Sequence, residues 1–465
     1  MNIKNKALSD FINYFFSEML VRGFLFVSLP LLTIILTPED YGKLSLIQSA
    51  ITIMYVFLGL NLQNSVFNTY MKSPVGFGSF LFSNLVAISV FQLIALLLAP
   101  LYIDSLGEVF GLTSYDMVLV IVISCMLTYL YSYTIYLQAS VQSKKYAKYN
   151  ITIKLVEVLF IFVFALLLTS EQYLSKAYAQ IVITGVALVF VFKRLSKIIE
   201  IKFSIKYVLS SIAFSVPLIP HVLSNSLLTQ VDRFILNHNI NATAVGLYSF
   251  GYNLSLILLV IVMAWNSSWQ PRMYKLLDDN NTKEIKQTII KVANFIIAIS
   301  SLVILFGSEV IVVFFSDSYS SSATIFPVLV MANTLTYLTV TFSNFIFYMK
   351  KSIFISLSTL TALIVNVYLN VKFIPIWGVE AAAWSTLVSY VLLSVMYYMA
   401  AKKSCAEVPV GLIFIFKFIG MLLGVYYFNY YIVSHFDLLL ALVIKLFVVV
   451  LFMVLTYVRI LKTRS

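Results

Sequence analysis

Charge is scarce in this sequence. Only 11% of its 465 residues are Asp, Glu, Lys or Arg, whereas 61% are hydrophobic. A soluble protein of this length usually carries about 25% charged residues. The scarcity excludes water as the main solvent of the folded chain.

Cysteine and the common catalytic motifs are also scarce. Cys125 and Cys405 are too few and too far apart for a disulfide framework or a metal site, and we expect both to pack as small apolar residues. No glycine-rich phosphate loop of the Walker type occurs, so ATP is not expected to be the direct energy source. No Cys/His constellation suggests a metal centre. We therefore expect no metal and no bound cofactor.

Long apolar runs fill the sequence instead. Runs of 18 or more residues recur from one end to the other, and each is long enough to span a bilayer. In lipid such runs must be helices, because every backbone group has to be satisfied internally, whereas a barrel would show short alternating segments. We predict an all-α polytopic membrane protein with about 14 transmembrane helices. The predicted spans are 11–36, 44–62, 77–102, 117–139, 151–169, 174–192, 207–230, 244–265, 289–315, 323–347, 352–370, 377–399, 409–428 and 436–458.

Basic residues are distributed unevenly over the loops between these spans. With the N-terminus inside, 24 of the 31 Lys and Arg residues fall on inner segments, four on outer segments and three inside spans. This asymmetry predicts cytoplasmic N- and C-termini in a bacterial inner membrane. It also accounts for the net charge of +12 without nucleic acid as a partner. No connecting loop exceeds about 25 residues, which leaves no room for a soluble catalytic or nucleotide-binding domain.

The chain is expected to consist of two parallel repeats. Six spans precede the basic linker 193–206 and six more end near Lys403, and an even number of spans returns the chain to the same side. Tyr41-Gly42 after the first span is echoed by Val245–Tyr248 after the seventh. We predict two six-helix lobes, 1–200 and 201–403, around a central cavity, with an extra helix pair in 404–465.

Several short motifs along the chain resemble the polysaccharide exporter family, which includes the Wzx-type O-antigen flippases. They lie in order and at sensible spacing, and together they are more specific than each is alone. They are Leu36–Leu46 (LTPEDYGKLSL), Asp232–Leu236 (DRFIL), Val245–Tyr248 (VGLY), Trp269–Pro271 (WQP), Asn366–Asn370 (NVYLN), Ile374–Gly378 (IPIWG) and Ala381–Ala383. The family belongs to a wider MATE-like superfamily of multidrug, oligosaccharidyl-lipid and polysaccharide transporters, and many of its O-antigen members are interpreted as having twelve spans.

The resemblance implies a flippase and not an enzyme. Its cargo would be an O-antigen or related repeat unit on undecaprenyl diphosphate, moved to the periplasmic leaflet by alternating access, with H⁺ or Na⁺ coupling or none. A polysaccharide polymerase and a chain-length regulator would be its protein partners, and membrane lipid would surround it. One alternative is a multidrug/cation antiporter of the same superfamily. Another is a membrane polysaccharide polymerase or acyltransferase, which would need a large outer loop or a His/Asp catalytic set.

Arg22 is the first candidate for contact with the diphosphate. It lies near the middle of the first span, where an arginine costs about 2.5–3.5 kcal/mol on translocon scales, so it should face a cavity or a partner. It could bind the diphosphate through paired hydrogen bonds. It could also pair with Glu18, one turn earlier on the same helix face.

Other polar residues inside spans have both a functional and a structural interpretation. Glu157 could couple transport to an ion or simply pair with Lys154, one turn away. Asn61 could bind sugar hydroxyls or be ordinary polarity at a membrane interface. His221 could be a cavity donor or proton acceptor, or a histidine bonded at a static kink. Trp265, Trp269 and Trp377 fall at predicted membrane interfaces and are interpreted as belt anchors.

The remaining candidates concern motion and lipid contact. Pro217 and Pro220 should bend the seventh span and could form a hinge between lobes. Asp232 and Arg233, near the outer end of that span, are interpreted as a structural or gating ion pair. Lys417 and Lys445 lie in the extra pair of spans and could contact lipid phosphate, although snorkelling or pairing is the favoured interpretation.

Overall fold

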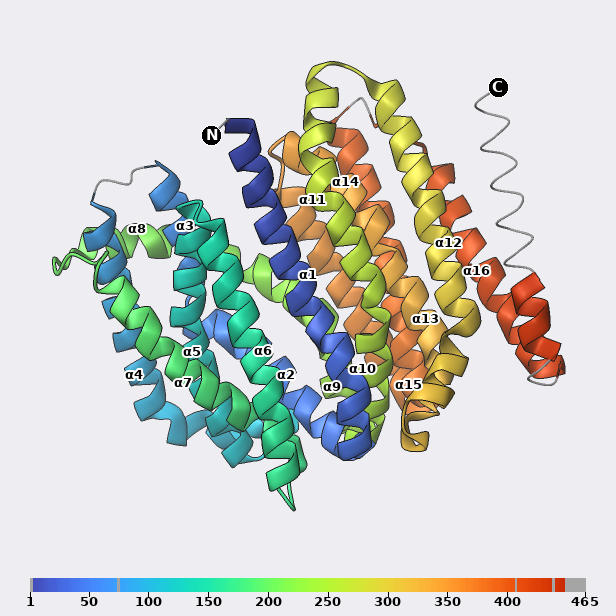
Figure 1. The fold of residues 1–465 in the computed structure, drawn as a ribbon, viewed down its shortest axis with the longest axis horizontal. Coiled ribbons are helices and arrows are strands. Elements are labelled where there is room, and N and C mark those ends of the chain that lie inside the picture. Colours follow the sequence, from blue (N-terminus) through green and yellow to red (C-terminus); the bar gives the residue numbers. More distant parts are fainter. Residues whose placement is uncertain (1–2, 73–75, 406–407, 437–439, 448–465) are drawn as a thin grey trace. The chain divides into compact units, whose positions relative to one another are not determined.

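The structure, a computed structural model, describes residues 3–72, 76–405, 408–436 and 440–447 (Figure 1). Within the first helix some side chains, those of Glu18 and Arg22 among them, lie outside this description. The described residues form helices and contain no strand. The prediction of an all-α fold is confirmed.

The helices follow the predicted spans. They are α1 (Ile3–Ile35), α2 (Pro38–Leu58), α3 (Gln63–Lys72), α4 (Phe77–Phe110), α5 (Ser114–Ala139), α6 (Ser143–Leu167), η1 (Gln172–Leu174), α7 (Ser175–Leu195), α8 (Ile205–Ser215), η2 (Val216–Leu218), α9 (Ile219–Asn239), α10 (Ala242–Ser255), α11 (Ile257–Asp278), α12 (Thr282–Phe314), η3 (Asp317–Tyr319), α13 (Ser322–Thr334), α14 (Thr336–Tyr348), α15 (Ile353–Ser404) and α16 (Leu412–His435).

The number of membrane crossings agrees with the sequence. Within the described ranges, eleven helical segments are long and apolar enough to cross a bilayer. One of them, the 52-residue α15, holds the two predicted spans 352–370 and 377–399, because its backbone leaves the helical region at Gly378 (φ 61°, ψ −136°). α1 covers the first predicted span, and most of the last, 436–458, lies outside the described residues. The chain is therefore a multi-pass membrane protein with about 14 spans.

Local signals in the sequence explain where two of these helices start. Thr37 caps α2 by accepting a hydrogen bond from the Asp40 amide, and Pro38 occupies the first turn, where its missing N–H is not needed. Thr113 and Asp116 form a reciprocal capping box at the start of α5.

By its internal contacts the chain divides into two compact units. Unit 1 comprises Met1–Phe250 with Thr359–Ala382, and unit 2 comprises Gly251–Ser358 with Ala383–Ser465. These bounds differ from those of the predicted lobes, 1–200 and 201–403, because the seventh span and part of the eleventh group with the first six. The division into two lobes and an extra pair stays a prediction.

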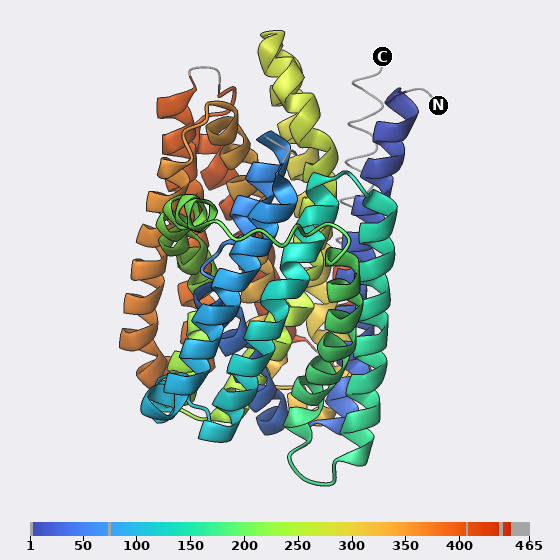
Figure 2. The ribbon, with the colours of Figure 1, turned by 90° about the vertical axis from the view of Figure 1, so that its left-hand side faces the viewer.

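Unit 1 is built around α2 and α5. α1 lies along α6, α2 along α5, and α7 against both α5 and α6. α4 faces outward, since only 11% of its most apolar stretch is buried. Figure 2 shows α4 to α7 side by side, with α8 seen nearly end-on at the left of this group. α8 and α9 therefore meet at a sharp bend, which lies at η2 between them.

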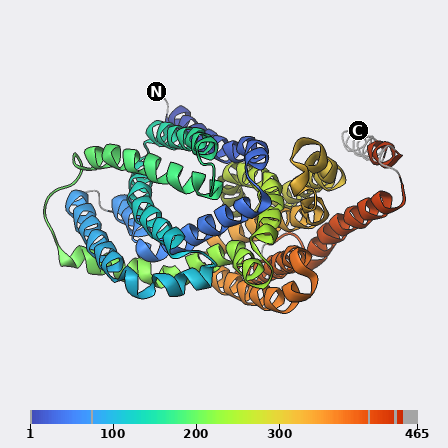
Figure 3. The ribbon, with the colours of Figure 1, turned by 90° about the horizontal axis from the view of Figure 1, so that it is seen from below.

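Unit 2 has its core in the α13–α14 segment, of which 94% of the most apolar stretch is buried. α12 packs against α13 and α16, and α11 packs against α12 and α14. Figure 3 shows α16 inclined to the helices of this unit that are viewed nearly end-on. The core also holds polar contacts: Asn333 donates to Ser255 at 2.7 Å, and Thr334 donates to Ser300 at 2.9 Å.

Candidate functional site

Glu157 lies buried on α6 in unit 1 and forms an ion pair inside the helix bundle. The Lys154 ammonium donates to both of its carboxylate oxygens at 3.2 Å. The Gln180 amide on α7 donates to the same carboxylate at 3.3 Å. The pairing with Lys154 that the sequence suggested is therefore present, and Gln180 is a partner that the sequence did not reveal.

Gln180 links this pair to α2. The amides of Gln180 and Gln48 donate to each other's carbonyl oxygens at 3.1 and 3.0 Å. The next residue of α2, Ser49, donates to the Gln230 side-chain oxygen at 2.8 Å. Two adjacent positions of α2 thus hold polar groups of α7 and α9. Hydrogen bonds of this kind, remote in sequence, fix the rotation of each helix about its own axis.

Arg233 on α9 completes this connected set. Its guanidinium donates to Ser249 at 3.0 Å, to Gln230 at 2.9 Å and to the Thr229 carbonyl at 2.7 Å. It also lies over the ring of Tyr248. We call the connected residues the unit 1 polar network; they are Lys154, Glu157, Gln180, Gln48, Ser49, Gln230, Arg233 and Ser249.

Asp232 is buried beside this network but forms hydrogen bonds with residues outside it. It accepts a hydrogen bond from the Tyr248 hydroxyl at 2.6 Å and another from the Asn370 amide of α15. Asn370 in turn donates to Asn366, one turn earlier, at 3.1 Å. Neighbouring residues on a helix do not face each other, and the hydrogen bonds described here take Asp232 and Arg233 to different partners. Their expected role as a gate is still a prediction.

Pro217 and Pro220 lie where the seventh span bends. η2 separates α8 from α9 at Val216–Leu218, and Pro220 occupies the first turn of α9. The predicted bend is present because neither proline can donate a helical hydrogen bond. His221 follows directly and is half-buried; its Nδ1 atom has no hydrogen-bond partner among the residues that the structure describes. Whether the bend moves during transport stays a prediction.

Asn61 lies at a second break, between α2 and α3. It is buried within the protein, and both its contact with sugar hydroxyls and its place at a membrane interface stay predictions. Its side-chain oxygen accepts from Asn64 at 2.8 Å and from Gln63 at 3.3 Å. Its amide donates to the Ser215 carbonyl of α8 at 3.5 Å.

Arg22 and Glu18 belong to α1, but their side chains lie outside the described part of the structure. Their proposed contact with each other or with a diphosphate is therefore a prediction still. The helix itself is well placed for a role, because α1 packs along α6, which carries Lys154 and Glu157. Asn13 of α1 donates to Ser143 at the start of α6 at 3.1 Å.

The two lysines of the extra pair differ in their surroundings. Lys445 in unit 2 is fully buried and donates to the Glu309 carboxylate of α12. Pairing, the favoured interpretation, is therefore observed for Lys445. Lys417 on α16 is exposed, so snorkelling and contact with lipid phosphate both stay predictions for it. α16 carries the side chain outward at this position.

The tryptophans only partly fit an interfacial belt. Trp377 is 61% exposed, as an anchor should be, but Trp269 is only 3% exposed. Trp269 stacks on Trp265 with ring centroids 5.8 Å apart, and Trp265 also contacts Tyr337 in the core of unit 2. The expectation of a belt position is wrong for Trp269, because tertiary packing overrides the position along the helix.

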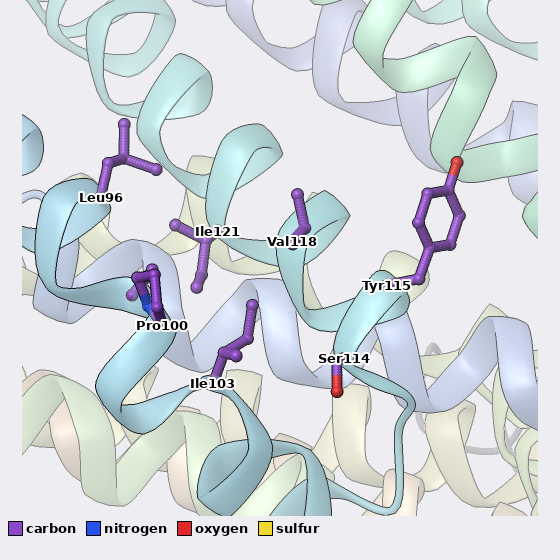
Figure 4. A pocket seen from close by; sticks show the side chains of 8 residues that line it. Leu96, Pro100, Ile103, Ser114, Tyr115, Val118 and Ile121 are labelled. Carbon is purple, nitrogen blue, oxygen red and sulfur yellow. The ribbon is translucent and has the colours of Figure 1, made fainter.

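An open groove lies on unit 1 between α4 and α5 (Figure 4). It has a volume of about 440 Å³, and its walls are almost wholly apolar, with Leu96, Pro100 and Ile103 on one side and Val118 and Ile121 on the other. Ser114 and Tyr115 lie at one end. Since only 11% of the most apolar stretch of α4 is buried, this groove is suited to hydrocarbon and not to a polar cargo.

The fold and the buried polar groups define a polytopic α-helical membrane protein with charged side chains held inside its bundle. Residues 7–277 match the model of a family described as polysaccharide biosynthesis protein. The chain belongs to this family. It is 27% identical over 204 residues to Lsg locus protein 1 of Haemophilus influenzae, a match that covers 42% of this chain and 49% of that protein. The chain thus spans about half the length of this relative.

Solved structures with the same fold are more distant in sequence. The lipid II flippase MurJ in an inward closed conformation matches with a TM-score of 0.73 and 15% identity, over 98% of this chain and all of that one. An inward-facing multidrug resistance MATE family transporter of the MOP superfamily matches with a TM-score of 0.62 and 12% identity, over 84% and 94% of the two chains. The resemblance seen in the sequence motifs is confirmed at the level of family and fold.

Proposed function

We propose that this protein is a flippase that moves an undecaprenyl-diphosphate-linked oligosaccharide, an O-antigen or related repeat unit, from the cytoplasmic to the periplasmic leaflet. The observation that carries this proposal is the unit 1 polar network, which places buried charges and amides among lipid-spanning helices. Ionisable residues inside a membrane are costly and as a rule serve a transport path. Membership of a polysaccharide biosynthesis family indicates what is transported.

The cargo sets a clear physical requirement. A sugar head group and a diphosphate cannot cross about 30 Å of hydrocarbon unaided, because their hydrogen bonds to water would be lost. The polar network offers hydrogen-bond donors in its place. Lys154 and Arg22 belong to the neighbouring helices α6 and α1, so cationic groups for the diphosphate would come from one helix pair. The polyprenyl tail would stay in lipid.

Energy for transport need not come from a nucleotide. A diphosphate moving outward goes down the membrane potential, and two uncompensated charges gain roughly 4–5 kcal/mol per 100 mV. Coupling to H⁺ or Na⁺ would add to this. Glu157, one of the buried acids of unit 1, is the coupling candidate, and binding of a proton or ion there would compete with its pairing to Lys154. Alternating access would be achieved by rocking of the two predicted lobes around the bend at Pro217 and Pro220.

The competing functions differ in what they predict. A multidrug/cation antiporter of the same fold would export small cations and confer resistance to them. A polymerase or acyltransferase would transfer groups without moving lipid. The basic character of the α1–α6 pair favours an anionic cargo over a cationic one. A polysaccharide polymerase and a chain-length regulator would act on the exported units as partners.

Reconstitution tests the proposal. Purified protein is placed in liposomes with a fluorescent lipid-linked oligosaccharide, and exposure on the outer leaflet is measured by quenching. We expect transport by the wild type, at least tenfold slower transport by Arg22→Ala, and partial recovery by Arg22→Lys, which keeps the charge but not the planar fork. Lys372→Ala removes an exposed cation and serves as the control.

One result would count against this function, and another against the role of Arg22 alone. Efflux of small cations without movement of the oligosaccharide lipid would favour the antiporter. Normal transport by Arg22→Ala would remove Arg22 from the site while leaving the flippase function standing.

A further inference from the structure

Two breaks between helices of unit 1 lie next to each other. One, at residues 59–62, separates α2 from α3 at the end of the second span, and the other, at η2 within the seventh span, separates α8 from α9. The Asn61 amide donates to the Ser215 carbonyl, the last residue of α8, at 3.5 Å and so connects the two breaks. In transporters, broken helices of this kind frequently surround a binding site.

The first break is held in a costly backbone conformation. Leu60 and Asn61 both have positive φ angles, of 47° and 53°. A left-handed conformation costs roughly 1–2 kcal/mol for an L-residue other than glycine, and it is least expected at a bulky leucine. The glycine of this turn, Gly59, has a negative φ of −89° and does not relieve the strain. Surrounding contacts must therefore maintain the turn, as they often do at functional sites.

Three oxygen atoms at the two breaks lack a hydrogen-bond partner among the described residues. They are Gln63 Oε1, Ser211 Oγ and Ser215 Oγ. Their residues are 3%, 1% and 0% exposed. The orientation of Gln63 is set by its amide nitrogen, which donates to the Tyr55 hydroxyl at 2.6 Å and to Asn61 at 3.3 Å. Its carbonyl oxygen therefore remains as an acceptor, and leaving it without a donor or a cation costs about 1–3 kcal/mol.

The backbone adds more negative potential at the same place. α2 and α8 both end here, and the last carbonyl groups of a helix carry partial negative charge. Pro217 has no amide hydrogen to give to the Ala213 carbonyl, four residues earlier. The breaks thus combine uncompensated side-chain oxygens with helix carboxyl ends, and both attract a positive charge.

We propose that Asn61, Gln63, Ser211 and Ser215 form a binding site for a small monovalent cation, Na⁺ in the first instance. We call these four residues the elbow site. Neutral amide, hydroxyl and carbonyl oxygens suit a hard monovalent ion, whereas Ca²⁺ and Mg²⁺ are usually held with the help of carboxylates. Deep burial of the acceptor atoms suits a bare ion better than a sugar ring. The role of this ion in the transport cycle rests on the proposed flippase function, but its binding does not.

Cation binding can be measured on the purified full-length protein without any lipid-linked substrate. Thermal unfolding in detergent is followed in NaCl, KCl and choline chloride at equal ionic strength, and ²²Na⁺ binding is measured directly. We expect stabilisation that rises with Na⁺ and is absent in choline. Ser215→Ala and Gln63→Leu should weaken Na⁺ binding about tenfold or more. Gln63→Glu keeps the side-chain shape and adds a negative charge, so it should bind Na⁺ more tightly.

A matched control is provided by Ser132→Ala on α5. Ser132 is also a buried serine of unit 1, but its hydroxyl donates to the Thr128 carbonyl at 2.8 Å and has its partner. This variant should bind Na⁺ as the wild type does. Equal unfolding temperatures in all three salts and no bound ²²Na⁺ would overturn the elbow site and mean that water satisfies its oxygens. If Na⁺ does not bind but oligosaccharide flipping persists in choline chloride, the elbow site is wrong while the flippase function stands.

Discussion

Gly42 of α2 and Gly246 of α10 cross at backbone contact, and the contact is reciprocal. A Cβ atom on Gly42 would lie 1.8 Å from the carbonyl oxygen of Ala242, and one on Gly246 would lie 1.8 Å from the carbonyl oxygen of Pro38. Each carbonyl lies four residues before the other glycine. Reciprocal contacts of this kind are what a two-fold axis produces. They support the idea that the Tyr41-Gly42 and Val245–Tyr248 motifs are echoes of one ancestral repeat.

Alanine at either glycine should therefore interfere with this crossing. Gly42→Ala or Gly246→Ala would force the two helices apart, because a methyl group cannot lie 1.8 Å from a carbonyl oxygen. If the transport cycle requires the two helices to come this close, the rate of flipping in liposomes should fall at least tenfold for each variant. The double variant should be little worse than either single one, since one methyl group already separates the helices.

Gly420→Ala and Gly424→Ala on α16 provide the controls for that experiment. A Cβ atom at either position has open space around it, and alanine favours a helix over glycine by up to about 1 kcal/mol. These variants should unfold no earlier than the wild type and flip normally. Full flipping activity in Gly42→Ala would show that the cycle does not depend on the crossing.

The partly buried pair of Lys154 and Glu157 should stabilise the fold only while both partners are present. Glu157→Gln leaves the ammonium with a weaker acceptor, and losing a hydrogen bond to a charged group costs roughly 1.5–3 kcal/mol. The double variant Lys154→Met/Glu157→Leu removes both charges and should recover most of that loss. Thermal unfolding in detergent measures the effect. An unchanged unfolding temperature together with lost ion dependence of transport would instead favour the coupling role of Glu157.

The sequence predicts the helices well because hydropathy is a local property. The span ends, the bend at Pro217 and the pairing of Lys154 with Glu157 all depend on residues within one or two turns of each other. The sixth and thirteenth predicted spans, for example, are present as α7 and α16.

Contacts between distant helices could not be predicted in this way. The Gln48–Gln180 pair joins residues 132 positions apart, and Asp232 and Asn370 are 138 positions apart. Both depend on how each helix is rotated about its own axis, which an apolar run does not specify. The partner of Lys445, Glu309, is another such case, 136 positions away. A sequence signal did exist for Asn366 and Asn370, which lie one turn apart within an otherwise apolar span.

Tyr248 should help to hold Asp232 in place. Its hydroxyl donates to the carboxylate at 2.6 Å, so Tyr248→Phe should lower the free energy of unfolding by roughly 1.5–3 kcal/mol. Tyr149→Phe on α6 is the comparison for loss of a hydroxyl, because the Tyr149 hydroxyl is buried without a hydrogen-bond partner among the described residues. Chemical denaturation of the purified protein measures both variants. Equal stability of Tyr248→Phe and the wild type would mean that the Asp232 carboxylate finds another donor.

The ion pair between Lys445 and Glu309 should hold residues 440–447 against α12. Lys445 is fully buried, and removing one partner of a buried ion pair typically costs about 3–5 kcal/mol, because the other charge is left in an apolar environment. Glu309→Gln should therefore loosen residues 440–447 and make the protein more sensitive to a protease added in detergent, with cleavage mapped by mass spectrometry. Lys445→Leu/Glu309→Leu removes both charges and should restore resistance, whereas Lys417→Leu, at an exposed position of α16, should leave the cleavage pattern unchanged. Resistance in Glu309→Gln equal to that of the wild type would show that apolar packing alone holds this segment and that the ion pair adds nothing to it.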